Sequence, residues 1–580
     1  MKSGLTTKDY SGIVTVAVAG DKIKDRGPAG NNVSANVNTA TTITSGVNIP
    51  GGTVPDDAKV VDVVAPVWKK VSSSANAIDP EDKTSSTATI TFKGTDTYYA
   101  GNTLTADKIK VFVNGEEVKS SSITKTLSAA TNLTEQRKEF GKTTTATKQY
   151  GVQYTLTIKG FTQGADQVKI QIPAGTLTDE SGNSNKDTEM VLYSVLKSTT
   201  TENAGTSEFL GNNKIQRQNI ENITFETSVP STVYNEETGE YVDSTAWDVS
   251  ARGDKSIIAW YETSNANGAL KVHIGSNDEI FANQNSTLLF AYIGYADICT
   301  ATEAITNLEL LNVGSVTNMN SMFKFCGYRT MKSLNLGRNF DTSNVTDMSS
   351  MFEAFGYKAT EGLDLGTKFY TNNVTNMYYM FEHCGYDVMS SLTLGENFDT
   401  SKVTNMSYMF AYCGYNEMTG LNLGNKFITS KVTDMSSMFS HFASNKLTSL
   451  NLGANFDTSL VQYMGHMFDN TGYTEMTSLN LGDKFNTSSV TDMQYMFNAT
   501  GHNKMPSLSL GEKFNTNSVT NMNYMFKDCG ASAMTTLNLG PAFTKIADQN
   551  TEFMVNCGTT GLVIYAPESI YSNKTAFYVK

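Results

Sequence analysis

The stretch FDTSKVTNMSYMF, residues 398–410, decides the fold predicted for this chain. Its valine belongs to a series that recurs every 29 residues without an insertion, at positions 316, 345, 374, 403, 432, 461, 490 and 519. A constant period of this length is typical of repeat architectures, in which each copy stacks on its neighbours and none is stable alone. The repetition favours a recognition surface over a catalytic pocket.

Each copy contains two apolar patterns. MTGLNL at 418–423 has the LxxLxL spacing of a leucine-rich-repeat strand, with Gly420 and Asn422 facing outward. In VTDMSSMF at 432–439 the apolar residues fall at i, i+3, i+6 and i+7, which predicts one face of a short helix. Phe427 between them recurs in all eight copies and predicts a buried spine of stacked rings.

The repeat resembles the BspA-type leucine-rich repeats, whose mark is a VTNM-x-x-MF element after F-x-T-S. The resemblance covers about 245–565. Within that range the chain departs from the family pattern at LVQY, residues 460–463, and at Ala443-Ser444. It implies a bacterial secreted or surface protein used for adhesion to host proteins, other bacteria or glycans.

The N-terminal third has a different organisation. Alternating runs at 87–92, 108–113, 154–158 and 168–172 predict strands of a bacterial Ig-like β-sandwich. A second run at 14–18 resembles the last of these, so we predict that the chain begins inside a preceding module, which explains the missing signal peptide. Asp179, Asn183 and Asn185 are a weak calcium candidate; a plain turn is favoured.

We therefore predict a multidomain chain: an all-β Ig-like sandwich followed by a β/α leucine-rich-repeat solenoid with a parallel β-sheet. The predicted boundaries are 1–58 for the remnant of a preceding Ig-like module, 59–198 for the sandwich, 199–244 for a linker, 245–304 for a β-rich cap with a degenerate repeat, 305–565 for the solenoid and 566–580 for the C-terminal cap or tail.

Composition excludes several classes of function. The net charge is −13 with 17% charged residues, so the basic footprint of a nucleic-acid binder is absent. No apolar run is long enough to span a bilayer. The six cysteines are too few for a disulfide scaffold, and buried free thiols are favoured, although a bridge between Cys384 and Cys413 stays open. We expect no cofactor and no metal.

Two rows of side chains are candidates for ligand contact. The first row faces outward from the predicted strands, and its candidate residues are Asn335, Asp364, Thr393, Asn422, Asn451, Asn480 and Asn538. The second row follows the repeat glycine and consists of Tyr328, Tyr357, Tyr386, Tyr415 and Tyr473. A solvated strand face and packing of each ring on its neighbour are the structural alternatives. Arg252-Gly253-Asp254 spells an integrin tripeptide, for which a plain turn is favoured.

The predicted function is non-catalytic binding by an extracellular, bacterial cell-surface adhesin. Its expected partners are host extracellular proteins or glycans, or another bacterial surface. The alternatives are a structural spacer that presents other domains, and a hydrolase without a recognisable motif. The histidines show no metal-binding spacing, and the four in the repeats are interpreted as lying in unequal phases. The chain is therefore predicted not to be an enzyme.

Overall fold

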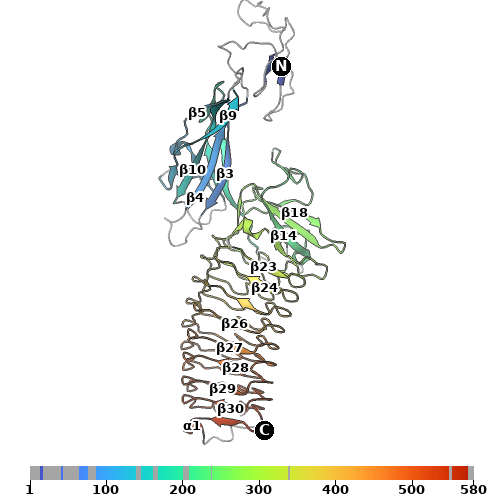
Figure 1. The fold of residues 1–580 in the computed structure, drawn as a ribbon, viewed down its shortest axis with the longest axis vertical. Coiled ribbons are helices and arrows are strands. Elements are labelled where there is room, and N and C mark those ends of the chain that lie inside the picture. Colours follow the sequence, from blue (N-terminus) through green and yellow to red (C-terminus); the bar gives the residue numbers. More distant parts are fainter. Residues whose placement is uncertain are drawn as a thin grey trace, which may run out of the picture. The chain divides into compact units, whose positions relative to one another are not determined.

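The computed structural model describes residues 14–16, 41–43, 64–75, 87–119, 121–138, 145–160, 167–199, 208–236, 238–337, 340–547 and 552–571 (Figure 1). These residues form two compact units: the first contains the described residues up to Leu192 except Gln167, and the second contains Gln167 and the described residues from Tyr193 on. Apart from strands β1 (Val14–Val16) and β2 (Thr41–Ile43), the module predicted at 1–58 lies outside the described residues. Residues 572–580 of the predicted tail lie outside them as well.

The first unit is built from antiparallel strands, as the alternating runs predict. One sheet has the order β3-β4-β10-β8, with β9 also paired to β10. Its strands are β3 (Val67–Ala75), β4 (Thr87–Thr95), β8 (Thr124–Leu127), β9 (Thr131–Lys138) and β10 (Thr145–Lys159). The other antiparallel pairs join β6 (Lys110–Val113) to β7 (Glu116–Glu117) and to β11 (Gln167–Ile172), and β5 (Tyr99–Asn102) to β12 (Leu177–Asp179).

The alternation of apolar and polar residues along the strands explains the core of this unit. Strand β4 buries Ala88, Ile90 and Phe92 on one face while the intervening residues are only partly covered. The Trp68 ring packs on Phe92 with centroids 5.5 Å apart, and its Nε1 donates to Thr176 Oγ1 at 3.1 Å. The indole therefore contributes apolar area without leaving its N–H unsatisfied.

The second unit begins with a mixed sheet of order β17-β18-β19-β14-β21. Its strands are β14 (Ile220–Glu226), β17 (Trp247–Asp248), β18 (Ile258–Thr263), β19 (Leu270–Gly275) and β21 (Ile305–Thr306). A 3-10 turn, η2 (Arg217–Asn219), leads into β14, and β15 (Tyr234–Asn235) pairs with β16 (Glu240–Tyr241). Ordered strands thus occupy part of the stretch predicted to be a linker.

Parallel pairing begins before the strict repeats. The end of β13 (Thr188–Val195) pairs through Tyr193–Val195 with β20 (Glu279–Phe281), and β20 pairs with β22 (Leu311–Asn312). The degenerate copy at 286–292 donates backbone N–H groups to the first strict copy, for example from Phe290 to Met322 O at 2.8 Å. This copy therefore covers the apolar edge of the repeats, as a capping repeat must.

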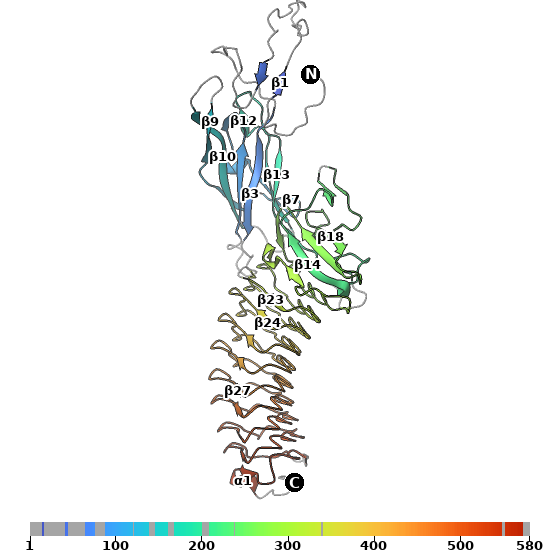
Figure 2. The same ribbon diagram turned by 45° about the vertical axis from the view of Figure 1, so that its right-hand side comes forward.

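The strict repeats form short strands that pair with their neighbours 29 residues away (Figures 1 and 2). The strands are β23 (Ser333–Asn335), β24 (Gly362–Asp364), β25 (Leu392–Thr393), β26 (Leu421–Asn422), β27 (Ser449–Asn451), β28 (Ser478–Asn480), β29 (Ser507–Ser509) and β30 (Thr536–Asn538), followed after the strict repeats by β31 (Val563–Tyr565), which pairs with β30. They belong to separate small sheets, three of two strands and one of three, and not to one continuous sheet.

The predicted fold class, a β/α leucine-rich-repeat solenoid on one parallel sheet, is wrong. Within the described residues the helical elements are α1 (Glu568–Tyr571) and three 3-10 turns, η1 (Ala106–Lys108), η2 and η3 (Leu308–Leu310), and none lies at the repeats' predicted helix positions. The described regular structure is nearly all β, in small antiparallel, parallel and mixed sheets.

The backbone of 432–442 explains the missing helix. Ser437 and His441 adopt left-handed conformations with φ of 55° and 56°, which a right-handed helix does not accommodate. Alternate N–H groups donate to the next copy, as from Ser437 to Gly465 O at 2.8 Å and from Phe439 to Met467 O at 2.9 Å. The groups between them close turns, as from Met438 to Met435 O. An α-helix requires those donors within its own segment.

The apolar positions of each copy are nevertheless buried as predicted. The eight phenylalanines of the spine, at 340, 369, 398, 427, 456, 485, 514 and 543, are at most 2% exposed. The prediction of a buried spine is confirmed. Together with the methionines they belong to one apolar core that extends from Leu196 to Ile570. Turns that point inward bury the same residues that a helix face would have buried.

Candidate binding surface

The outward row of the repeat strands, here called the amide row, is exposed at every predicted position. It contains Asn335, Asp364, Thr393, Asn422, Asn451, Asn480 and Asn538, with Ser509 in the same phase. Each Asn or Asp side chain accepts a hydrogen bond from the glycine two residues later, as Asn422 Oδ1 does from Gly424 N at 3.0 Å. This Asx turn ends the strand and orients the side chain.

The Asx turn uses only the side-chain oxygen of each asparagine and leaves its Nδ2 group without a hydrogen bond in the turn. Asn451 Oδ1 and Asn480 Oδ1 accept from Gly453 and Gly482, both at 3.0 Å. Because an amide oxygen is the acceptor, the Nδ2 donors point away from the turn. Among the described residues no acceptor pairs with the Nδ2 groups of Asn422, Asn451 and Asn480. The row therefore presents a repeated hydrogen-bond donor to solvent.

An open groove of about 400 Å³ adjoins the first members of the amide row. It is lined by Asn335, Gly337, Asp364, Gly366, Thr367, Phe369, Leu394, Gly395, Glu396 and Asn397. Its lining mixes carboxylates and amides with glycines and apolar side chains, so it does not by itself select a class of ligand.

The predicted tyrosine row is half-buried, and its rings stack on one another. Tyr328 and Tyr357 have centroids 4.8 Å apart, Tyr357 and Tyr386 4.5 Å, and Tyr386 and Tyr415 4.7 Å. Tyr473 is separated from this run and stacks on the imidazole of His502 at 4.5 Å. Each ring covers the face of its neighbour, so the row presents edges and hydroxyl groups.

A second aromatic row, missed in the sequence, runs beside the tyrosines. It contains Phe325, His383, Tyr412 and His441, and Tyr412 stacks on His383 at 4.4 Å and on His441 at 4.3 Å. The two histidines are two 29-residue steps apart, so the interpretation that the histidines lie in unequal phases is wrong for this pair. Aligning the residues that follow Phe410 and its equivalents would have revealed the row.

The tyrosine row predicts a loss of stability at alkaline pH. Burial raises the pKa of Tyr386 to about 12 from its ordinary value of 10.0, and the neighbouring Tyr357 and Tyr415 add to this. Between these values the unfolded chain has released a proton that the folded chain retains. The free energy of unfolding should therefore fall as the pH rises through this window.

Urea unfolding at a series of pH values from 9 upward checks this prediction. The Tyr386→Phe variant, which keeps the ring but has no titrating hydroxyl group, should show a smaller loss over the same window. Equal pH dependence in the two proteins would contradict a contribution from Tyr386.

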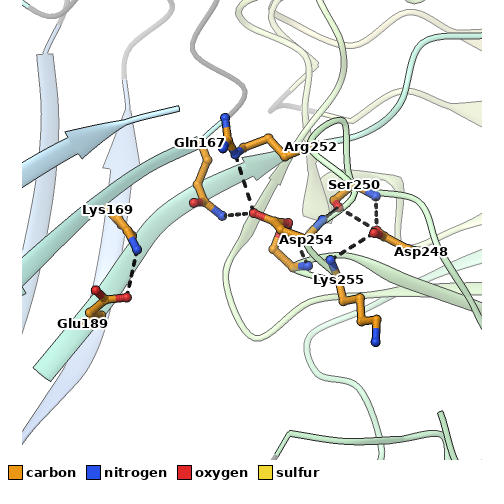
Figure 3. A network of polar contacts seen from close by, with 9 residues as sticks. Gln167, Lys169, Glu189, Asp248, Ser250, Arg252, Asp254 and Lys255 are labelled. Atoms are coloured by element: carbon orange, nitrogen blue, oxygen red, sulfur yellow. Dashed lines mark hydrogen bonds and ion pairs between the residues drawn. The ribbon is translucent and has the colours of Figure 1, made fainter. Parts of the chain in front are cut away.

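The Arg-Gly-Asp tripeptide forms a closed turn (Figure 3). Gly253 has φ of 69° and donates its N–H to Ser250 O at 3.2 Å. Asp254 pairs with Arg252 at 3.8 Å, and its Oδ2 also accepts from Gln167 Nε2 at 2.8 Å. Figure 3 shows both partners directed at the Asp254 carboxylate. The interpretation as a plain turn is confirmed, since the tripeptide's charged groups are engaged internally.

The calcium candidate is an Asx turn between strands. Asp179 Oδ1 accepts the N–H groups of Ser181 at 2.9 Å and Asn183 at 2.8 Å, while Oδ2 accepts from Asn183 Nδ2 at 2.7 Å. Asn185 Oδ1 accepts the N–H of Leu177 at 2.8 Å. These oxygens face N–H donors, so they do not converge on a common cation position.

Three side-chain pairs could in principle take part in catalysis. Ser440 Oγ lies 3.0 Å from His441 Nδ1, and His466 Nδ1 lies 2.8 Å from Asp469 Oδ2. His273 Nδ1 contacts Glu226 at 2.8 Å. A nucleophile, a base and an orienting carboxylate do not meet in one chain of contacts in these pairs. Within the described ranges there is no group of three or more metal-binding side chains and no helix long and apolar enough to cross a membrane.

Comparison with known families identifies the repeat region as the recognisable part of the chain. Four overlapping segments, 297–416, 355–476, 389–507 and 440–539, match the family described as Mycoplasma protein of unknown function, DUF285. No curated protein and no solved structure matches the chain. The match is to the repeats and carries no activity with it. The resemblance to BspA-type repeats stays a prediction.

Proposed function

We propose that this chain is a non-catalytic binding protein of a bacterial cell surface, and that its repeats contact a protein or glycan ligand through the amide row. One observation carries the proposal: an exposed donor recurs in the same orientation in successive copies and is not used within the fold. A ligand with regularly spaced acceptors, such as peptide carbonyls or sugar hydroxyl groups, matches this chemistry.

Repetition is what makes weak contacts useful. A single exposed amide contributes little to binding, because water competes for it. Once a ligand is held at one copy, contacts at neighbouring copies become effectively intramolecular, and the affinities accumulate. The amide row is favoured over the tyrosine row because the tyrosine faces, which carry most of the contact area of an aromatic ring, are covered by other rings.

Lysine substitution tests the amide row. In the triple variant Asn422→Lys, Asn451→Lys, Asn480→Lys, a long charged side chain replaces three donors, and the loss of three hydrogen bonds should weaken binding roughly tenfold to a hundredfold. The control variant Ser430→Lys, Ser459→Lys, Ser488→Lys adds the same charge to the same three copies, eight residues further along each. Both should stay folded, because neither set is buried; the amide variant also gives up three Asx-turn hydrogen bonds, so its melting temperature is measured and binding is compared below it.

The measurement is attachment of the parent and both variants to immobilised extracellular-matrix proteins and glycans. Loss in the amide variant alone supports the proposal, and equal binding by all three proteins contradicts it. If the parent binds nothing on the panel, the proposal of a binding protein is abandoned for that of a structural spacer. The uninterrupted apolar core from Leu196 to Ile570 is the observation that favours a spacer.

A further inference from the structure

The sixth strict copy breaks a second periodic row. The residue two positions after each repeat valine is Asn or Asp in the other seven copies, namely Asn318, Asp347, Asn376, Asn405, Asp434, Asp492 and Asn521. In the sixth copy it is Tyr463, which is 48% exposed. Leu460, three residues earlier, is 52% exposed where the two preceding copies have Lys402 and Lys431.

Neither substitution is needed for the fold. Asp434 Oδ1 accepts from Ser436 N at 2.9 Å and Asp492 Oδ1 from Gln494 N at 3.0 Å, so the usual residue caps a turn. Tyr463 supplies no such acceptor, and among the described residues the Gly465 N–H has none. The backbone is otherwise regular, with Met435 N donating to Tyr463 O and Met464 N to Asp492 O, both at 3.0 Å. The sixth copy thus gives up a cap and exposes two apolar side chains.

The surroundings of Tyr463 suit a cation. Tyr463 bridges Asp434 on one side and Asp492 on the other, in parallel register. No ion pair engages either carboxylate within the part of the chain that the structure describes. The tyrosines of the predicted row stack on neighbouring rings, whereas the Tyr463 ring has no described ring partner. An uncovered aromatic face between two unpaired carboxylates attracts a guanidinium or ammonium group.

We propose that Leu460, Tyr463, Asp434 and Asp492 form a docking site for a protein segment that carries a basic side chain beside an aliphatic one. The basic group lies over Tyr463 between the aspartates, and the aliphatic group packs on Leu460. Lys431 occupies the position of Leu460 in the preceding copy, and its positive charge disfavours a cation on the Leu460 side. The chain's net charge of −13 favours approach of a basic partner. This site does not depend on the amide row.

The double variant Leu460→Lys, Tyr463→Asn tests the site, because it introduces the residues that the copy with Lys402 and Asn405 carries at these positions and returns an acceptor for the Gly465 N–H. Short random peptides displayed on phage are selected on the immobilised full chain, and the recovered peptides are synthesised and titrated against parent and variants. Arg- or Lys-containing peptides with an adjacent aliphatic residue should bind the double variant about tenfold or more weakly than the parent.

Two controls make the outcome decisive. The double variant should unfold at the same or a higher temperature than the parent, so lost binding is not lost folding. The Asn422→Lys, Asn451→Lys, Asn480→Lys variant should bind the selected peptides like the parent, which separates this site from the proposed function. The proposal is overturned if no peptide is recovered, if the peptides lack basic residues, if they bind the double variant equally, or if a glycan array gives a ligand that requires Tyr463 instead.

Discussion

Replacement of Phe427 by alanine is expected to lower the free energy of unfolding by about 3–5 kcal/mol. The side chain is 2% exposed, and its ring lies between those of Phe398 at 6.4 Å and Phe456 at 6.3 Å. Truncation removes a large apolar surface and leaves a cavity that the neighbouring turns cannot close, because hydrogen bonds to the adjacent copies hold them in place. Urea unfolding of the full chain measures the loss.

The loss should spread beyond one copy. In a stack of repeats the stability of each copy includes its interfaces with both neighbours, so a cavity at Phe427 weakens the copies on either side. Hydrogen exchange should accelerate first in the copies around Phe398 and Phe456. Leu460→Ala removes an apolar side chain that is 52% exposed. It should therefore lower the free energy of unfolding by much less than Phe427→Ala does. Similar losses in the two variants would show that the spine does not carry the repeat core.

Replacement of Arg217 by methionine is expected to cost roughly 3–5 kcal/mol, since it strands the carbonyl groups of Leu289 and Ala291 at about 1–3 kcal/mol each, while Leu288 O keeps a bond from Ala291 N. Arg217 is 1% exposed, and its Nη1 donates to Leu288 O at 2.8 Å, Leu289 O at 3.0 Å and Ala291 O at 3.4 Å. Burial lowers its pKa to about 10. The guanidinium carbon also lies 5.2 Å from the centre of the Phe209 ring.

These carbonyls belong to the degenerate copy that covers the first strict repeat. Leu288 has a left-handed backbone with φ of 60°, so the segment forms no helix; its own turn satisfies Leu288 O, through Ala291 N at 3.1 Å, and leaves Leu289 O and Ala291 O to Arg217. The variant should therefore open the start of the repeat region at lower urea concentration. Arg252→Met is the matched control, because its partner Asp254 keeps hydrogen bonds from Gln167 and Ser256. Equal stability of the Arg217 variant and the parent would refute the proposed role of Arg217 in the cap.

The sequence alone determined which residues of the repeats are buried and which segments form strands with alternating buried and exposed residues. The 29-residue period placed the phenylalanine spine, the exposed Asn422 and its equivalents, and the stacked tyrosines, because identical spacing puts identical side chains in identical environments. The period-2 run at 87–92 predicted a strand, and β4 begins at Thr87. These features depend on local pattern and on the simple rule that apolar side chains face inward.

Only the tertiary structure decided the backbone path between Val432 and Phe442. A helix and a chain of inward turns bury the same four apolar side chains, so the pattern cannot distinguish them. What distinguishes them is the acceptor of each N–H: Ser437 and His441 donate to residues in the next copy, at 2.8 Å and 2.6 Å. That choice depends on a partner segment 29 residues away, as does the stacking of His383 on Tyr412. The contact of Arg217 with 288–291 depends on a segment more than 70 residues away.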